Sequence, residues 1–505
     1  MAANPFLEPS PLPAGLPPFA SIRDDDYEPA FERGMSEHLV AVAKVAENPE
    51  APTFENTIEA LEMAAGLLGR VSAAFFTISA ADGRPAIRDL EARMAPRLAA
   101  HEDAIHLNSR LFTRIEAVHT DRESLEPEQR YLTERYHTEF VLAGAALPTA
   151  SKDELRMLNE RLSELTTRFD ANLVADSNDL AVHLTDPADL EGLAPDERAT
   201  ARAAADERGL DGWLLTLVLP TSQPALASLA RPAVRARLLE ASLARGSRAG
   251  EHDNRPLVLE IVRLRARRAH LLGFPNHAAS VLADETARTP EAVSAMLDRL
   301  VPAAARNARA EAAALADRMR QETGRDGPLP ASDWAWAAER ERAARFDLDT
   351  ERLKPYLEAD RVLRDGVFAA AGRLYGLRFT ERTDLAGYHP EVRVFEVADE
   401  DGVLGLYLLD LFTRDTKRGG AWMNSIVDRV GVLDQDQAVV VNNLNVLKPP
   451  AGEPALLTLD STETLFHEFG HALHGLFAAT RYPKTAGTNV PRDFVEFPSQ
   501  VNEMW

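Results

Sequence analysis

Apolar residues recur at three- and four-residue spacing through most of the first 375 positions, and this period constrains the fold more than any other feature. It predicts helices at Tyr27–Ala46, Thr57–Ala80, Ile87–Val118 and Glu128–Leu173, and again from about Leu226 to Tyr375. Pro96 and Pro148 are expected to kink or divide two of these helices. Such stripes are typical of core packing, so the chain is expected to be mainly α-helical.

Strand-like patterns are confined to two parts of the chain. Short apolar runs at Leu180–Leu184 and Trp213–Pro220 flank a charged helical stretch. From about Val392 three longer runs, VRVFEV, VLGLYLLDLF and AVVVNNLNVL, are separated by clusters of turn-forming residues. A small sheet is therefore expected directly before a C-terminal helix. The expected domains are a helical region at 1–180, a helical region with short strands at 181–390, and the sheet and final helices at 391–505.

The composition restricts which cellular compartment and which classes of binding partner are expected. Cysteine is absent, which excludes disulfides, thiolate metal sites and cysteine nucleophiles. The net charge of -23 disfavours binding to phosphate backbones, so no nucleic-acid partner is expected. The proline-broken N-terminus has no signal pattern, and the apolar stretches near Trp213–Leu219 and Val403–Phe412 are too short to span a bilayer. A cytoplasmic protein without a membrane partner is expected.

The segment HEFGH carries the strongest chemical signal in the sequence. His467 and His471 are four residues apart, about one helical turn, so both rings can reach one ion. Glu468 follows the first histidine, as in H-E-x-x-H metallopeptidases. Zinc bound by two imidazoles and a carboxylate keeps one position for water, and a neighbouring glutamate can take the proton of that water. The alternative is a buried helix whose two histidines have only structural hydrogen bonds.

A third ligand must come from outside this pentapeptide. His474 lies one turn after His471 and would be a strained ligand. After a loop the chain offers three acidic residues, Asp493, Glu496 and Glu503. Glu496 is favoured because its phenylalanine neighbours argue against a solvated face, but the other candidates stay open.

Supporting residues are expected around these ligands. Asp460 with Glu463 three residues later has the pattern of a capping box, and the helix is expected to run to about Ala478. Glu463 also lies one turn before the first histidine, while Ser499 and Gln500 lie about one turn after Glu496. These three residues are candidates for orienting the metal ligands, although Glu463 could serve only as a cap.

The strand Val439–Val446 precedes the histidine helix by about twenty residues. This placement suggests that it binds the backbone of a peptide by adding it as an extra strand. The alternative is an interior strand with no free edge.

Several motifs together resemble the thimet-oligopeptidase family of zinc peptidases, and within it the bacterial peptidyl-dipeptidases (dipeptidyl carboxypeptidases). They are HEFGHALHGLF, GTNVPRDFVEFPSQVNEMW, the NPF and LPPF segments near the start, PTFENTIEALE, KRGGAWMNS and VVVNNLNV. The resemblance covers the whole chain.

The resemblance implies two helical halves that flank a deep channel, with a small sheet next to the zinc-binding helix. It implies that His467, His471 and Glu496 bind zinc and that Glu468 is the catalytic base. It also implies short peptides as substrates, release of C-terminal dipeptides, and a monomer.

Members of this family continue beyond the point where this sequence stops, so the resemblance implies that a C-terminal part is missing. That part holds a histidine and tyrosines that stabilise the tetrahedral intermediate. Two alternatives to dipeptide release follow: a general oligopeptidase of the same family, or a non-catalytic fragment that keeps the metal and peptide site.

Overall fold

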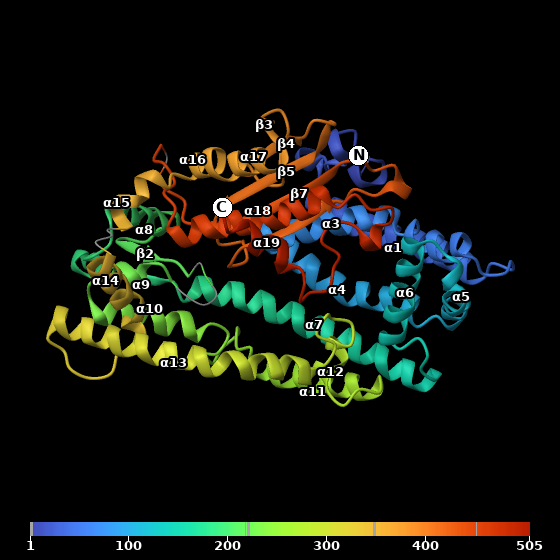
Figure 1. The fold of residues 1–505 in the computed structure, drawn as a ribbon, viewed down its shortest axis with the longest axis horizontal. Coiled ribbons are helices and arrows are strands. Elements are labelled where there is room, and N and C mark those ends of the chain that lie inside the picture. The colour runs from blue at the N-terminus through green and yellow to red at the C-terminus, as the bar shows by residue number, and fades with distance from the viewer. Residues whose placement is uncertain (1–3, 218, 220–222, 347–349, 451) are drawn as a thin grey trace.

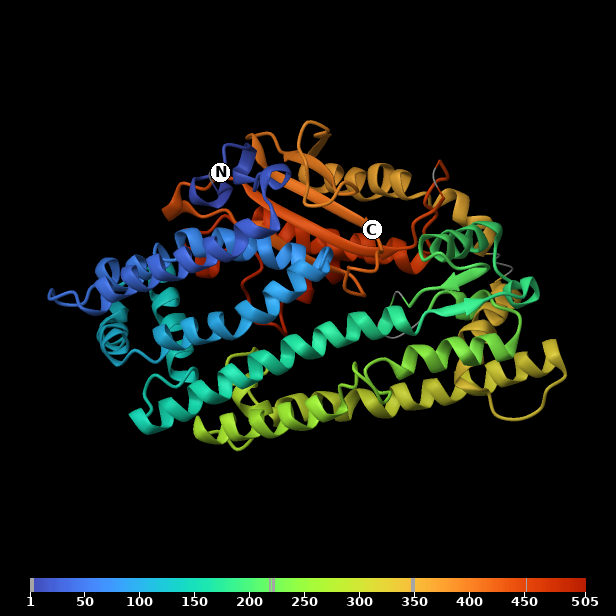
Figure 2. The same cartoon turned by 180° about the vertical axis from the view of Figure 1, so that it is seen from behind.

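The computed structural model describes residues 4–217, 219, 223–346, 350–450 and 452–505. Helices dominate, which confirms the prediction of a mainly α fold. Figures 1 and 2 show them in layers. The sheet and the helix with the HEFGH segment lie at the top, a long helix crosses the middle, and two further long helices form the bottom.

The helices of the N-terminal half are α1 (Asp24–Ala46), α2 (Ala60–Glu62), α3 (Gly66–Ala81), α4 (Pro85–His106), α5 (Ser109–Thr120), α6 (Pro127–Leu142), α7 (Thr149–Asp179), α8 (Pro195–Glu207), α9 (Ala225–Ser228) and α10 (Pro232–Ala244). Those of the C-terminal half are α11 (Arg255–Leu271), α12 (His277–Leu282), α13 (Pro290–Thr323), α14 (Trp334–Phe346), α15 (Thr350–Leu353), α16 (Ala359–Arg361), α17 (Ala369–Tyr375), α18 (Leu459–Phe477) and α19 (Glu496–Asn502).

The strands form two sheets. A short antiparallel pair joins β1 (Val182–Leu184) and β2 (Trp213–Leu215). The larger sheet contains β3 (Arg378–Glu381), β4 (Arg393–Ala398), β5 (Val403–Phe412), β6 (Trp422–Val427) and β7 (Ala438–Val446), in the spatial order β3-β4-β5-β7-β6. Strands β5 and β7 are parallel, and the other neighbours are antiparallel.

Both faces of the larger sheet are buried. Alternate residues of a strand point to opposite faces and therefore belong to two different cores. Leu406 and Val441 belong to a core shared with α1, α3 and α4. Tyr407 and Val440 belong to a second core shared with α17 and α18. One face of the sheet therefore packs on α17 and α18, while the opposite face packs on helices from the beginning of the chain.

The sequence patterns located most elements but misjudged some boundaries. Pro148 divides α6 from α7 as predicted, whereas α4 runs through Pro96 without a break. The predicted helix Ile87–Val118 ends instead at His106. The side chain of Asn108 then accepts hydrogen bonds from two backbone amides and caps the next helix, α5. The short strands β3 and β6 were not predicted. Residues 218 and 220 of the predicted run Trp213–Pro220 lie outside the described residues.

One apolar stretch was overlooked in the sequence. Phe54–Ala81 is long and apolar enough, by length and composition alone, to cross a membrane, with a hydropathy of 1.4. In the structure it comprises a π-helical segment, α2 and α3, and Val71 and Phe75 are fully buried in the first core. Of the apolar window, 44% is buried, and core helices of globular proteins meet the same length and composition criteria.

The proposal that Val439–Val446 adds a peptide strand is wrong. This segment is β7, and it is hydrogen-bonded to β5 on one side and to β6 on the other. The long-range parallel pairing with β5 puts it inside the sheet and moves the edge to β6.

Candidate active site

The helix α18 begins two residues earlier than its capping pattern suggested. Thr458, not Asp460, is the N-cap, and its hydroxyl accepts a hydrogen bond of 3.0 Å from the amide of Ser461. Asp460 lies in the first turn, where its charge is favourable to the helix dipole. Glu463 is exposed.

The apolar face of α18 fixes its rotation about the helix axis. Leu465, Phe469 and Leu476 are almost fully buried against the second core. This orientation leaves His467 and His471 on the side that faces α19. Burial of one helical face therefore decides where the two imidazoles point.

The helix α19 lies directly on α18 at a glycine. A Cβ added to Gly470 would lie 2.7 Å from the Cα of Ser499 and 2.8 Å from the Cβ of Asn502. Close to this contact, Asn502 donates its side-chain amide to the carbonyl of Phe466, at 2.6 Å. Any residue larger than glycine at 470 would push α19 away from the histidines.

The two helices bring two imidazoles and one carboxylate together. The Nε2 atoms of His467 and His471 lie 3.1 and 3.2 Å from the same oxygen of Glu496. The potential ligand atoms of these three residues all lie within 4.8 Å of one another. Ser499 donates its hydroxyl to the same Glu496 oxygen, at 2.9 Å.

This geometry fits a zinc ion. Ligand atoms about 2.0–2.1 Å from zinc at the corners of a tetrahedron lie roughly 3.3 Å apart. The two nitrogen–oxygen separations are close to that value. Two imidazoles and a carboxylate are also a ligand set that leaves a fourth position for water or substrate.

A contact that was not predicted from the sequence lies at the other nitrogen of His467. Glu503 Oε1 lies 2.6 Å from His467 Nδ1, on the side of the ring away from Glu496. A carboxylate there accepts the Nδ1 proton and leaves Nε2 free to bind a metal. The available signal was the spacing, because Glu503 follows Glu496 by seven residues, about two helical turns.

Glu468 is set apart from the potential ligands by its burial. Its side chain is only 4% exposed, and Oε2 has no hydrogen-bond partner among the described residues. Burial, with a contribution from the charge of Glu496, raises the pKa of Glu468 to about 7, although His467 acts in the opposite direction. A carboxyl group with a pKa near neutral can both take up and release a proton.

The other candidates have different surroundings. His474 is not among the residues that the structure brings together, and burial lowers its pKa. Asp493 points to the turn before α13, where Thr286 and Ala287 donate hydrogen bonds to it. Gln500 is exposed.

Glu496 and its phenylalanine neighbours are more exposed than the sequence suggested. Phe494 and Phe497 stack on each other at 5.8 Å and are 44% and 64% exposed, so these aromatic neighbours do not bury the carboxylate. The Glu496 side chain itself is 54% exposed. Its position next to the histidines comes from the docking of α19 and not from an apolar environment.

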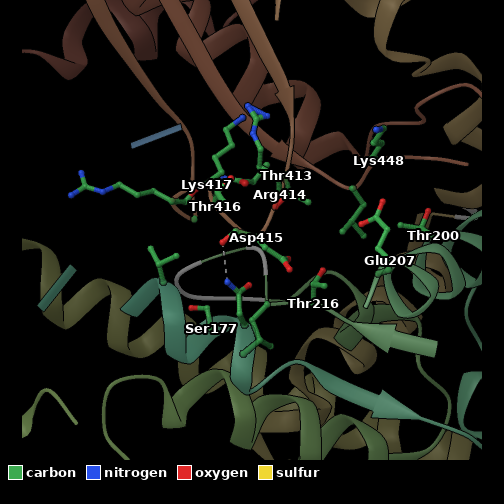
Figure 3. Close-up of a pocket in the computed structure, with 18 of the residues that line it drawn as sticks. Ser177, Thr200, Glu207, Thr216, Thr413, Arg414, Asp415, Thr416, Lys417 and Lys448 are labelled. Atoms are coloured by element: carbon green, nitrogen blue, oxygen red, sulfur yellow. Dashed lines mark hydrogen bonds between the residues drawn. The ribbon is translucent and has the colours of Figure 1, made fainter. Parts of the chain in front are cut away.

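A large cavity lies between the middle and upper layers, beside α7 (Figure 3). It has a volume of about 1280 Å³ and is lined by α7, α8, α10 and the segment Thr413–Gly419. Asn178 and Arg208 reach across it to Asp415, the first through a hydrogen bond of 2.9 Å to the carbonyl. The cavity is large enough for several amino-acid residues, but His467, His471 and Glu496 do not line it.

An H-E-x-x-H helix faced by a carboxylate from a second helix is the arrangement of a metallopeptidase. The sequence profile described as "Peptidase family M3" matches residues 225–505. The chain belongs to peptidase family M3 and is a metallopeptidase.

Curated relatives agree along nearly the whole chain. A dipeptidyl carboxypeptidase of Escherichia coli is 44% identical over 99% of this chain and 74% of the relative. An oligopeptidase A of Salmonella typhimurium is 32% identical over 97% of this chain and 73% of the relative. A solved structure described as an oligoendopeptidase F is 16% identical, with a TM-score of 0.50, and the match covers 96% of this chain and 69% of the solved chain. At this identity the match supports the fold alone.

Proposed function

We propose that this chain is a zinc-dependent peptidase that releases dipeptides from the C-termini of short peptides. One observation carries the zinc assignment: two imidazole nitrogens lie within 3.2 Å of a single oxygen of Glu496. His467, His471 and Glu496 would hold the ion. Glu503 and Ser499 contact two of these ligands and would keep them oriented.

Zinc in such a site lowers the pKa of water and polarises the scissile carbonyl. Glu468 would accept the proton of the attacking water at its carboxylate and then pass it to the departing amine. The raised pKa of about 7 suits both transfers, since the group exchanges a proton readily near neutral pH.

The release of dipeptides is supported by the two relatives described as dipeptidyl carboxypeptidases. A second candidate is cleavage at internal bonds of oligopeptides, which the relatives described as oligopeptidase A favour. Both candidates use the same metal site and differ in how the end of the peptide is recognised.

Product analysis separates these candidates. An N-acetylated hexapeptide with a free C-terminal carboxylate should yield a dipeptide and then a second dipeptide, as measured by mass spectrometry. The same peptide with a C-terminal amide should be cleaved poorly. Equal cleavage of both peptides at internal bonds would support the oligopeptidase instead.

The metal assignment has its own test. His467→Ala should remove most of the bound zinc, measured by elemental analysis after dialysis, and should abolish turnover. Half-buried His183, in the short strand β1 and outside the proposed ligand set, serves as the control. Equal zinc in wild type, His467→Ala and His183→Ala would refute the site.

A further inference from the structure

The exposed ligand Glu496 contacts α18 and Ser499, and the segment that leads into α19 makes a further polar contact with the rest of the fold. The segment before α19 descends from the upper layer to the connection between α12 and α13 (Figures 1 and 2). At that point Asp493, three residues before Glu496, accepts hydrogen bonds from the amide of Thr286, the hydroxyl of Thr286 and the amide of Ala287. Their lengths are 2.9, 2.6 and 2.9 Å.

We propose that Asp493 and Thr286 are positioning residues that fasten the metal ligand Glu496 to the lower helical layer. This inference rests on the proposed zinc site. It assigns no contact with metal or substrate to either residue, because they act through the backbone that leads into α19.

The contact is made in both directions. The amide of Asp493 donates to Glu285 Oε2 at 3.3 Å, so backbone and side chain of Asp493 are both engaged by the same turn. The hydrogen bonds from Thr286 hold the pKa of Asp493 at about 2, which keeps the carboxylate charged throughout the physiological range.

The turn that receives Asp493 is itself anchored. Asp284 forms a bidentate ion pair with Arg135 of α6, with nitrogen–oxygen distances of 2.5 and 2.6 Å. Arg288 has a φ of +65°, a conformation that non-glycine residues rarely adopt and that persists where the surroundings enforce it. The turn is therefore held in place by contacts that do not involve α19.

Movement at Asp493 would be passed on to Glu496. The chain between them is a tight turn in which Phe494 donates its amide to the carbonyl of Pro491 and Phe497 donates to that of Phe494, both at 2.9 Å. Glu496 has no apolar burial to hold it, since its side chain is 54% exposed. Its distance from the histidines therefore depends on where its backbone is fixed.

Two substitutions test whether the contact between Asp493 and Thr286 positions Glu496. Asp493→Asn keeps the shape but replaces one acceptor oxygen by an NH₂ group, so at least one of the three hydrogen bonds is lost in either amide orientation. Thr286→Val removes only the hydroxyl of an exposed residue. Each change should weaken zinc binding by about tenfold, as is typical for groups that orient ligands. Zinc affinity is measured by competition with a chelator.

Controls separate positioning from general stability. Thr286→Ser restores the hydroxyl and should bind zinc within about twofold of wild type. Asp253→Asn changes a carboxylate that accepts hydrogen bonds from Arg255 at the start of α11, away from α19, and should leave zinc affinity unchanged. The double change Asp493→Asn with Thr286→Val should weaken zinc binding by less than the product of the two single effects, because both changes act on one contact between Asp493 and the turn.

The outcomes are distinguishable. If wild type and His467→Ala bind zinc equally, the proposed metal site is wrong. If wild type binds zinc and His467→Ala does not, but Asp493→Asn and Thr286→Val bind zinc as tightly as wild type, the positioning role of Asp493 and Thr286 is rejected. If Asp253→Asn weakens zinc as much as Asp493→Asn does, the effect is general and the inference also fails.

Discussion

The two helices that carry the potential zinc ligands are held in different ways. The helix α18 has 19 residues and buries one apolar face against the sheet. The helix α19 has seven residues, of which only Ser499 and Asn502 are buried. Its position depends on the close contact at Gly470 and on polar contacts from Asn502, Glu503 and Asp493.

This difference predicts two kinds of mutational effect. Damage to α18 should lower the stability of the whole upper layer, because core burial contributes most of the folding free energy. Damage to the polar contacts of α19 should leave the fold intact and loosen the carboxylate ligand. The histidines are thus positioned by packing, and Glu496 by hydrogen bonds.

The largest expected effect belongs to Glu468, a buried carboxyl group of α18 that is not among the potential zinc ligands. Glu468→Gln removes the base while keeping the shape, so turnover should fall roughly 10²–10⁴-fold. Bound zinc, measured by elemental analysis, should stay at the wild-type level. Wild-type turnover in this variant would mean that another group takes the proton of the water.

A pair of phenylalanines compares the two helices directly. Phe469 of α18 is 1% exposed and lies 5.3 Å from the ring of Tyr407, whereas Phe497 of α19 is 64% exposed. Phe469→Ala should lower the free energy of unfolding by about 3–5 kcal/mol and Phe497→Ala by less than about 0.5 kcal/mol, measured by urea denaturation. Similar losses for both would contradict the distinction.

The buried carboxyl of Glu468 predicts a pH dependence in the metal-free protein. Burial raises its folded-state pKa from 4.5 to about 7, so folding favours the protonated form. This stabilisation is complete below about pH 4.5 and is lost as the pH rises through 7. Between pH 4.5 and 8 the stability of wild type should fall by roughly 3 kcal/mol relative to Glu468→Gln. Parallel pH curves for the two proteins would refute this.

The contact behind His467 should affect metal binding more than stability. Glu503→Gln weakens the acceptor for the Nδ1 proton, and zinc affinity should fall by about 10–100-fold with little change in the thermal midpoint. Gln500→Ala and Glu463→Gln are the comparison, since both residues are exposed and their role at the ligands stays a prediction. Equal losses in all three would remove the special role of Glu503.

The smallest effect is expected at Ser499. Its hydroxyl donates to the Glu496 oxygen that faces both histidines. This hydroxyl also lies 2.9 Å from the backbone carbonyl of Glu496. Ser499→Ala removes the donor to both oxygens; the loss of the contact with the carboxylate, worth about 1 kcal/mol, should weaken zinc binding about fivefold. Titration with a chelator resolves a change of this size, and unaltered affinity would show that Glu496 is oriented by its backbone alone.

Local patterns in the sequence predicted α18 well because its determinants are local. The spacing of His467 and His471 and the apolar stripe depend on helical period, and the predicted end near Ala478 is one residue from the observed end at Phe477. The start was misplaced because Thr458 and Asp460 are both good capping residues, and only the extended backbone before the helix decides between them.

Features that depend on tertiary contacts were missed. Glu503 reaches His467 only because Gly470 lets the helices approach closely, and no local pattern reports such an approach. The interior position of β7 arises from parallel pairing with β5, whose residues precede it by about thirty positions. The exposure of Phe494 and Phe497 contradicts the argument from aromatic neighbours, and it is the docking of α19 that brings Glu496 close to the histidines.

The core shared by the first helices and the larger sheet has a consequence for synthesis. Phe31 and Phe75 pack in one cluster with Leu408 and Val441, which leave the ribosome more than 300 residues later. At roughly 5–20 residues per second, the early helices wait about 15–60 s for their partner strands. During that interval their apolar faces are open to chaperones and to self-association, so the yield of active enzyme should depend on translation rate and temperature as well as on the stability of the finished fold.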